Sequence, residues 1–175
     1  MRARAAGPRR SAARPEELPA LLEDGRGEPC DLRWPGEGTR PAARRALVVD
    51  DDRLARRLLG DALAEQGFEV HTAADGAEGM SKLLDLLLRL DLLVLDLCMP
   101  QLDGERLVSL IRRAGGEHDL TVVVVSGLLD AQTTARLLAA GANAALSKAA
   151  GAGEIVERAI AAMRAHQRAR RGSPA

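Results

Sequence analysis

Between residues 46 and 170, segments with the pattern of buried strands alternate five times with segments of helical periodicity. The strand segments are short apolar runs, and the helical segments repeat their apolar residues every three or four positions. Strict alternation of this kind predicts a parallel sheet with helices covering both faces. The predicted strands are residues 46–50, 69–72, 91–96, 120–126 and 143–147, and the predicted helices are residues 53–66, 76–89, 104–114, 131–140 and 153–170.

Three of the predicted strands end in polar side chains. The first is followed by the run Asp50-Asp51-Asp52, the third ends at Asp96, and the fourth ends at Ser126. The carboxyl ends of parallel strands meet at one edge of the sheet, where open α/β sheets hold their ligands, so we expect these side chains to lie together. A single carboxylate in such a place is more simply interpreted as a loop cap, but three strands with polar ends favour a functional site.

The chemistry of these side chains favours phosphoryl transfer. Carboxylates packed within several ångströms of one another repel unless a cation compensates them, and Mg²⁺ suits one or two carboxylates with several waters. Asp52 is placed to cap the following helix, which leaves Asp50 and Asp51 for the metal. Lys148 follows the fifth strand and is one of two lysines in a chain with 23 arginines, which favours a specific role for its compact ammonium. With Asp96 as the nucleophile, these groups form a site for a phosphoryl group.

The chain divides near residue 45. Six of its eight prolines precede residue 42, so we predict a disordered arm over residues 1–45, a domain over 46–170 and a disordered tail over 171–175. Residues 46–150 carry 10 basic and 16 acidic side chains, a net charge of −6, which argues against nucleic-acid binding by the domain itself. Two distant cysteines and the lack of a long apolar run predict a cytoplasmic protein without disulfides, zinc or membrane contact.

Residues 46–165 resemble the receiver domain of bacterial two-component response regulators. The acidic run after the first strand resembles the acidic motif of that family, and Ser126 and Lys148 follow in the expected order. Neither a Walker A loop nor a G-x-G-x-x-G fingerprint occurs, so the nucleotide-binding versions of such a fold lose support. The residues that stand at the spacing of the family's acceptor loop are Asp96, Met99, Pro100, Asp103 and Gly104.

The resemblance implies a flavodoxin-like (βα)5 fold, with a doubly wound five-stranded parallel sheet in the order 2-1-3-4-5. It also implies that Asp96 accepts a phosphoryl group from a histidine kinase or phosphotransfer protein, and that Ser126 and Lys148 bind the phosphoryl oxygens. The residues that it implies as Mg²⁺ ligands are Asp50, Asp51, Asp96 and, through its backbone carbonyl, Cys98. No further domain is expected after residue 171, so the favoured hypothesis is a stand-alone receiver that signals to a downstream protein target and is not a turnover enzyme.

Two departures from the family pattern concern the readout of phosphorylation. The family usually has Tyr or Phe where this chain has Ala145, and a proline, normally cis, where it has Ala149. A cis bond between Lys148 and Ala149 would cost about 3 kcal/mol. These departures support the alternative hypothesis, a receiver-shaped docking module that signals without phosphate. A phosphatase with an aspartate nucleophile is disfavoured, because Cys98 stands where such enzymes typically carry a second aspartate.

Overall fold

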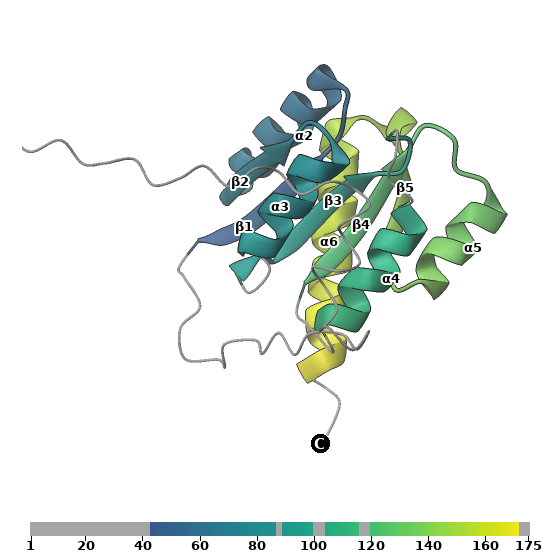
Figure 1. Cartoon of the computed structure of the whole chain (residues 1–175). Helices are drawn as coiled ribbons and strands as arrows, with labels where there is room; N and C mark the ends of the chain where they lie inside the picture. Colours follow the sequence, from purple (N-terminus) through teal and green to yellow (C-terminus); the bar gives the residue numbers. More distant parts are fainter. Residues whose placement is uncertain (1–42, 87–88, 100–103, 116–119, 172–175) are drawn as a thin grey trace, which may run out of the picture.

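The computed structural model describes residues 43–86, 89–99, 104–115 and 120–171. Its five strands are all parallel and form one sheet in the order β2-β1-β3-β4-β5 (Figure 1). This confirms the predicted flavodoxin-like fold class and the predicted strand order. The strands are β1 (Arg44–Val49), β2 (Phe68–Ala73), β3 (Leu92–Asp96), β4 (Thr121–Ser126) and β5 (Ala144–Ser147).

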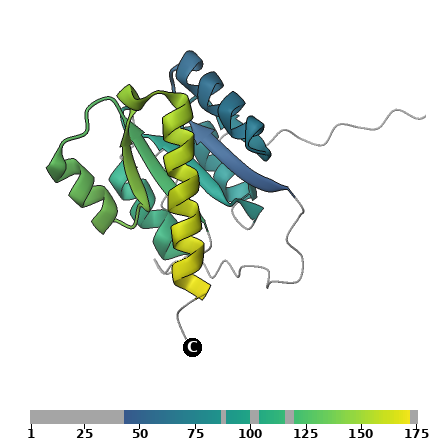
Figure 2. The same cartoon turned by 180° about the vertical axis from the view of Figure 1, so that it is seen from behind.

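Helices cover both faces of the sheet. The helices α2 and α6 pack on one face, and α3, α4 and α5 pack on the other, as the two opposite views show (Figures 1 and 2). A short 3-10 helix, η4, connects the last strand to the last helix. The helices are α2 (Arg53–Glu65), α3 (Gly76–Leu86), α4 (Gly104–Gly115), α5 (Ala131–Ala139), η4 (Lys148–Ala150) and α6 (Ala152–Arg171).

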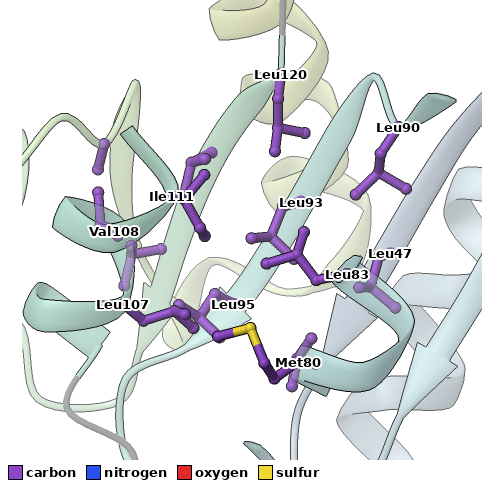
Figure 3. Packing of buried hydrophobic residues seen from close by; sticks show 14 of the residues in the cluster. Leu47, Met80, Leu83, Leu90, Leu93, Leu95, Leu107, Val108, Ile111 and Leu120 are labelled. Atoms are coloured by element: carbon purple, nitrogen blue, oxygen red, sulfur yellow. The ribbon is translucent and has the colours of Figure 1, made fainter. Parts of the chain in front are cut away.

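The two cores follow from the alternation of side chains along each strand. In β1, Leu47 and Val49 belong to the cluster beneath α3, α4 and α5, whereas Ala46 and Val48 belong to the cluster beneath α2 and α6. Strands β3 and β4 are buried at every position, which is why both appear in the sequence as continuous apolar runs. Figure 3 shows the first cluster, with side chains of α3 and α4 packed against β3, among them Met80, Leu83, Leu107, Ile111, Leu93 and Leu95.

Capping residues fix the ends of α2, the helix that follows the first acidic run. The Asp52 carboxylate accepts hydrogen bonds from the Leu54 and Ala55 amides at 2.7 and 3.3 Å, which confirms its predicted role as the N-cap. Gly67 has a φ of 82°, a left-handed conformation that glycine adopts without strain, and its amide donates to the Ala64 carbonyl. The turn from α2 into β2 therefore ends the helix at Glu65, one residue before the predicted end.

Some predictions fall outside the described residues. These are most of the arm, residues 1–42, the loop residues Pro100 and Asp103, and the tail residues 172–175. The arm predicted over residues 1–45 is two residues too long, because β1 begins at Arg44, and the third strand begins one residue later than predicted. The helix predicted over residues 76–89 is described from Gly76 to Leu86, and residues 87–88 lie outside the described part. Within the part of the chain that the structure describes, no helix is both long enough and apolar enough to cross a membrane.

Candidate functional site

Three carboxylates meet at the carboxyl edge of the sheet. Strands β1 and β3 pair with Val49 opposite Leu95, so Asp50 and Asp96, the next residue of each segment, come side by side. Carboxylate oxygens of Asp50, Asp51 and Asp96 all lie within 4.8 Å of one another. Asp50 and Asp96 are only 1% and 3% exposed, whereas Asp51 is exposed. The cluster therefore joins two buried acids to one that solvent can reach.

Lys148 supplies a cation to the buried pair. Its Nζ lies 2.7 Å from Asp96 Oδ2 and 2.9 Å from Asp50 Oδ2. Burial alone would lower the pKa of Lys148, but the hydrogen bonds to Asp96 and Asp50 outweigh burial and raise the pKa above its ordinary value. The side chain is therefore an ammonium at neutral pH, and it neutralises part of the charge of the two acids.

The loop that carries Lys148 differs from the geometry that a cis proline would impose. Among the described residues no peptide bond is cis, so the bond between Lys148 and Ala149 is trans. Ser147 caps η4, because its Oγ accepts a hydrogen bond from the Ala149 amide at 3.2 Å. Ala145 lies in β5 and packs, partly buried, against the first core cluster. Lys148 thus reaches the acidic cluster without a proline at position 149.

Asp50 is held at each of its polar groups. Its Oδ1 accepts from the Asp52 amide at 2.9 Å, its Oδ2 contacts Lys148, and its own amide donates to the Ala73 carbonyl at 3.2 Å. Its carbonyl accepts from Arg56 Nη1 at 2.6 Å. Burial raises the pKa of the Asp50 carboxyl, and the bonds from Lys148 and Asp52 only partly offset that rise. The Asp50 carboxylate is therefore rigidly placed and costly to ionise.

Asp96 and Ser126 occupy neighbouring positions on β3 and β4. Asp96 pairs in register with Val125, so Ser126 follows one residue beyond it. Asp96 Oδ1 accepts from the Cys98 amide at 3.0 Å. The fully buried Ser126 hydroxyl accepts from the Leu128 amide at 3.1 Å, and the Cys98 Sγ lies 3.3 Å from Ser126 Oγ. The predicted site residues are thus brought together, while the proposed role of the Cys98 carbonyl stays a prediction.

Arg56 is a residue at this site that the sequence analysis did not single out. It lies in the first turn of α2, and its guanidinium reaches back over the loop to the Asp50 carbonyl. The Cys98 thiol was likewise not expected to contact Ser126. A long cationic side chain six residues after Asp50 was the only signal for the first contact, and nothing in the spacing signalled the second.

The residues present fit a hard divalent cation. All the candidate ligand atoms of the cluster are oxygens, which Mg²⁺ prefers. In the described part of the chain the Asp51 carboxylate makes no hydrogen bond or ion pair, so it is free to turn toward a cation without losing a contact. Asp50 and Asp96, by contrast, carry more negative charge than Lys148 alone can neutralise. The cluster can therefore hold a divalent cation.

The chain is similar to proteins of one family over most of its length. The model of the response regulator receiver domain matches residues 46–160. Transcriptional regulatory protein PrrA of Mycobacterium tuberculosis is 39% identical over 131 residues, which cover 75% of this chain and 52% of PrrA. Chemotaxis protein CheY of Treponema pallidum is 30% identical over 124 residues, which cover 70% of this chain and 85% of CheY.

A solved structure shows the same fold. The signal receiver domain of the response regulator NarL from Mycobacterium tuberculosis has a TM-score of 0.61 and 28% sequence identity, and the match covers 71% of this chain and 98% of that domain. The chain spans only about half the length of PrrA.

Proposed function

The chain belongs to the family of response regulator receiver domains, and on this premise we propose that Asp96 accepts a phosphoryl group from a phosphohistidine of a histidine kinase or phosphotransfer protein. The observation that carries the proposal is the contact of 2.7 Å between Lys148 Nζ and Asp96 Oδ2, in a cluster that also holds Asp50 and Asp51. A cation placed at the acceptor stabilises the negative charge of an incoming phosphoryl group.

The proposed reaction forms one bond and breaks one. An oxygen of the Asp96 carboxylate attacks phosphorus, and the bond from phosphorus to the imidazole nitrogen breaks, so that the imidazole leaves with its electron pair. Both Asp96 oxygens are held in advance, Oδ1 by the Cys98 amide and Oδ2 by Lys148, which orients the carboxylate before the donor arrives. The Lys148 ammonium then binds one phosphoryl oxygen, and the Ser126 hydroxyl binds another.

We further propose that Mg²⁺ is the cofactor of this site. Its ligands would be the carboxylates of Asp50, Asp51 and Asp96 and the carbonyl of Cys98, partly through water. When bound, the ion supplies positive charge to the phosphoryl oxygens. Two of these residues support the proposal. Asp50 is held in place by three neighbours, and the Asp51 carboxylate is exposed and unpaired within the described residues, so it can turn toward a cation.

The output that we propose is phosphorylation-dependent binding to a downstream protein, with the chain acting as a stand-alone receiver and not as a turnover enzyme. The match to CheY, of which this chain covers 85%, supports this proposal. The Ser126 hydroxyl now accepts from the Leu128 amide, so drawing it to a phosphoryl oxygen removes a hydrogen bond from the β4–α5 loop. With Ala145 in place of an aromatic, that loop is the element whose conformational equilibrium the new charge shifts.

Mass spectrometry of the intact chain tests the proposal. Incubation with acetyl phosphate and Mg²⁺ should add one phosphoryl group, and hydroxylamine should remove it, as expected for an acyl phosphate. Asp96→Asn should take none, and chelation of Mg²⁺ should prevent labelling of the wild type. Asp61→Asn is the matched control, because Asp61 is exposed on α2 and its one ion pair in the described part of the chain is with Arg57, at 3.5 Å.

The same experiment separates the two hypotheses for the chain. A wild-type protein that takes no phosphoryl group would favour the docking module, and labelling of Asp96→Asn would assign the acceptor to another carboxylate. The contact between Lys148 and Asp96 favours phosphorylation, since it forms although Ala149 follows in a trans peptide bond.

A further inference from the structure

We propose that Arg56 is a positioning residue of the Mg²⁺ site, which it serves by holding the peptide group that joins Asp50 to Asp51. The inference rests on the proposed function, because it concerns the same metal site. It assigns a role to a side chain that carries no ligand atom itself.

The contacts of Arg56 are made with the main chain of the acidic run. Its Nη1 donates to the Asp50 carbonyl at 2.6 Å and lies 3.4 Å from the Asp51 carbonyl. The Asp50 carbonyl belongs to the peptide bond between the two aspartates. The orientation of that peptide plane sets the direction in which the Asp51 side chain leaves the backbone. Holding this carbonyl therefore restricts where the Asp51 carboxylate can lie.

Asp51 depends on its backbone more than the other two acids do. Asp50 is fixed through both carboxylate oxygens, and Asp96 is fixed through the Cys98 amide and Lys148. The Asp51 carboxylate has no such contact among the described residues. A ligand without contacts of its own is placed only by the main chain that carries it, so its entropy cost on metal binding falls when that main chain is rigid.

The hydrogen bonds of the Arg56 guanidinium all go to this stretch of main chain, among the described residues. Within the ranges that the structure describes, its guanidinium forms no ion pair with a carboxylate, and its bonds go to the two carbonyls. Its backbone is anchored as well, because its amide donates to the Asp52 carbonyl at 2.9 Å. Nη1 lies within hydrogen-bonding distance of both carbonyls and belongs to a rigid planar group, which the flexible ammonium of lysine replaces only in part.

Calorimetric titration of Mg²⁺ into the full chain measures the affinity that Arg56 is proposed to raise. Arg56→Met keeps the apolar stem and removes the donors, and we expect Mg²⁺ affinity to fall about tenfold, as for other residues that orient metal ligands. The Mg²⁺ affinity of Arg56→Lys should lie between those of Arg56→Met and the wild type. Arg57→Met is the control, because Arg57 is exposed and its one ion pair among the described residues is with Asp61. The Mg²⁺ affinity of this variant should stay within about twofold of the wild type.

Labelling by acetyl phosphate at increasing Mg²⁺ separates positioning from direct contact. For Arg56→Met the Mg²⁺ concentration that gives half the maximal rate should rise by the same factor as the dissociation constant, while the rate at saturation should match the wild type. Circular dichroism without Mg²⁺ shows whether each variant is folded. If Arg56→Met does not fold, Arg56→Lys decides, since weaker Mg²⁺ binding is expected for it too.

An unchanged Mg²⁺ affinity in the folded Arg56 variants would overturn the inference while leaving the proposed function intact. A lower rate at saturation with unchanged affinity would also overturn it, by assigning Arg56 to the phosphodonor. A wild-type chain that neither binds Mg²⁺ nor takes a phosphoryl group would refute the proposed function and this inference together.

Discussion

The ammonium of Lys148 lies 2.9 Å from the buried carboxylate of Asp50, although Asp50 follows the first strand and Lys148 the last. The same ammonium contacts Asp96 at 2.7 Å. Lys148 is thus the counter-ion of two acids that would otherwise repel each other. A Mg²⁺ ion bound by Asp50 would share that carboxylate with Lys148, which couples metal binding to the position of this side chain.

Replacing Lys148 should destabilise the protein in the absence of Mg²⁺. Lys148→Met leaves two buried carboxylates without their cation, which should lower the free energy of unfolding by roughly 3 kcal/mol at neutral pH. Saturating Mg²⁺ should restore part of the loss, because it compensates the same charges in the folded state only. Urea denaturation with and without Mg²⁺ measures both effects.

Lys82→Met is the control for Lys148→Met, because Lys82 is the only other lysine of the chain. Its side chain is 39% exposed, pairs with Glu78 within α3 at 2.7 Å and donates to the Thr72 carbonyl, so its loss should cost about 1–2 kcal/mol, less than that of Lys148. Equal losses in the two variants would contradict a special role for Lys148.

The contribution of Lys148 to stability should also depend on pH. The pKa of Lys148 in the folded protein lies above its ordinary value of 10.5, so its contribution to stability is complete below pH 10.5 and disappears as pH rises through the folded pKa.

Mg²⁺ affinity should fall in mild acid because of Asp50. Burial raises the pKa of this carboxyl above its ordinary value of 3.8, so protons compete with Mg²⁺ at a higher pH than for an ordinary aspartate. In the metal-free protein, the pH dependence of the contribution of Asp50 to stability has the opposite sign to that of an aspartate in an ordinary salt bridge. The contribution of Asp50 to folding is complete below pH 3.8 and is lost as pH rises through the folded pKa.

Titrations of Mg²⁺ between neutral pH and pH 4 test this dependence. Asp50→Asn should bind Mg²⁺ more weakly and should lose the part of the pH dependence that belongs to Asp50. A wild-type affinity that stays constant until the pH approaches 3.8 would contradict the assignment.

The adjacent residues Asp51 and Asp52 should have separable effects. Asp51→Ala should weaken Mg²⁺ binding and leave the melting temperature of the metal-free protein equal or higher, because it removes a repelling carboxylate. Asp52→Ala should lower the melting temperature, because α2 loses its N-cap, and should keep Mg²⁺ affinity. Asp52→Asn, which can still cap, is the control. The reverse pattern would exchange the roles of the two residues.

The cap of Asp52 should also weaken in acid. Hydrogen bonds from the Leu54 and Ala55 amides hold the pKa of Asp52 below its ordinary value of 3.8. Its contribution to stability is therefore present above pH 3.8 and is lost as pH falls through the folded pKa.

The phosphorylated form should decay slowly. Hydrolysis needs a water in line with the bond to Asp96, and by analogy with the family the side chains of Cys98 and Leu128 flank that approach. The Cys98 thiol contacts Ser126. Neither the Cys98 thiol nor the Leu128 side chain can orient water as a carboxylate does. Leu128→Glu should therefore speed dephosphorylation, because its carboxylate can orient the attacking water. Leu138→Glu, an exposed position on α5, is the control, and equal decay rates of Leu128→Glu and the wild type would refute the prediction.

Local patterns predicted much of the fold. The apolar runs of β3 and β4 predicted strands buried on both faces. The Asp52 carboxylate caps the start of α2, and the left-handed backbone of Gly67 follows its end. The order of the strands did not follow from periodicity, because any parallel arrangement satisfies the same apolar pattern. It followed only from the resemblance to the receiver family, and the structure has the same order.

The sequence by itself determined which polar groups would gather at one edge, because parallel strands place the residues that follow them on the same side of the sheet. Only the tertiary structure decided which atoms pair. The bridge from Lys148 to Asp50 and Asp96, and the contact of Cys98 with Ser126, join residues that end or follow different strands. Their separations depend on the twist of the sheet and on the packing of the helices against it, and no local pattern in the sequence records those distances.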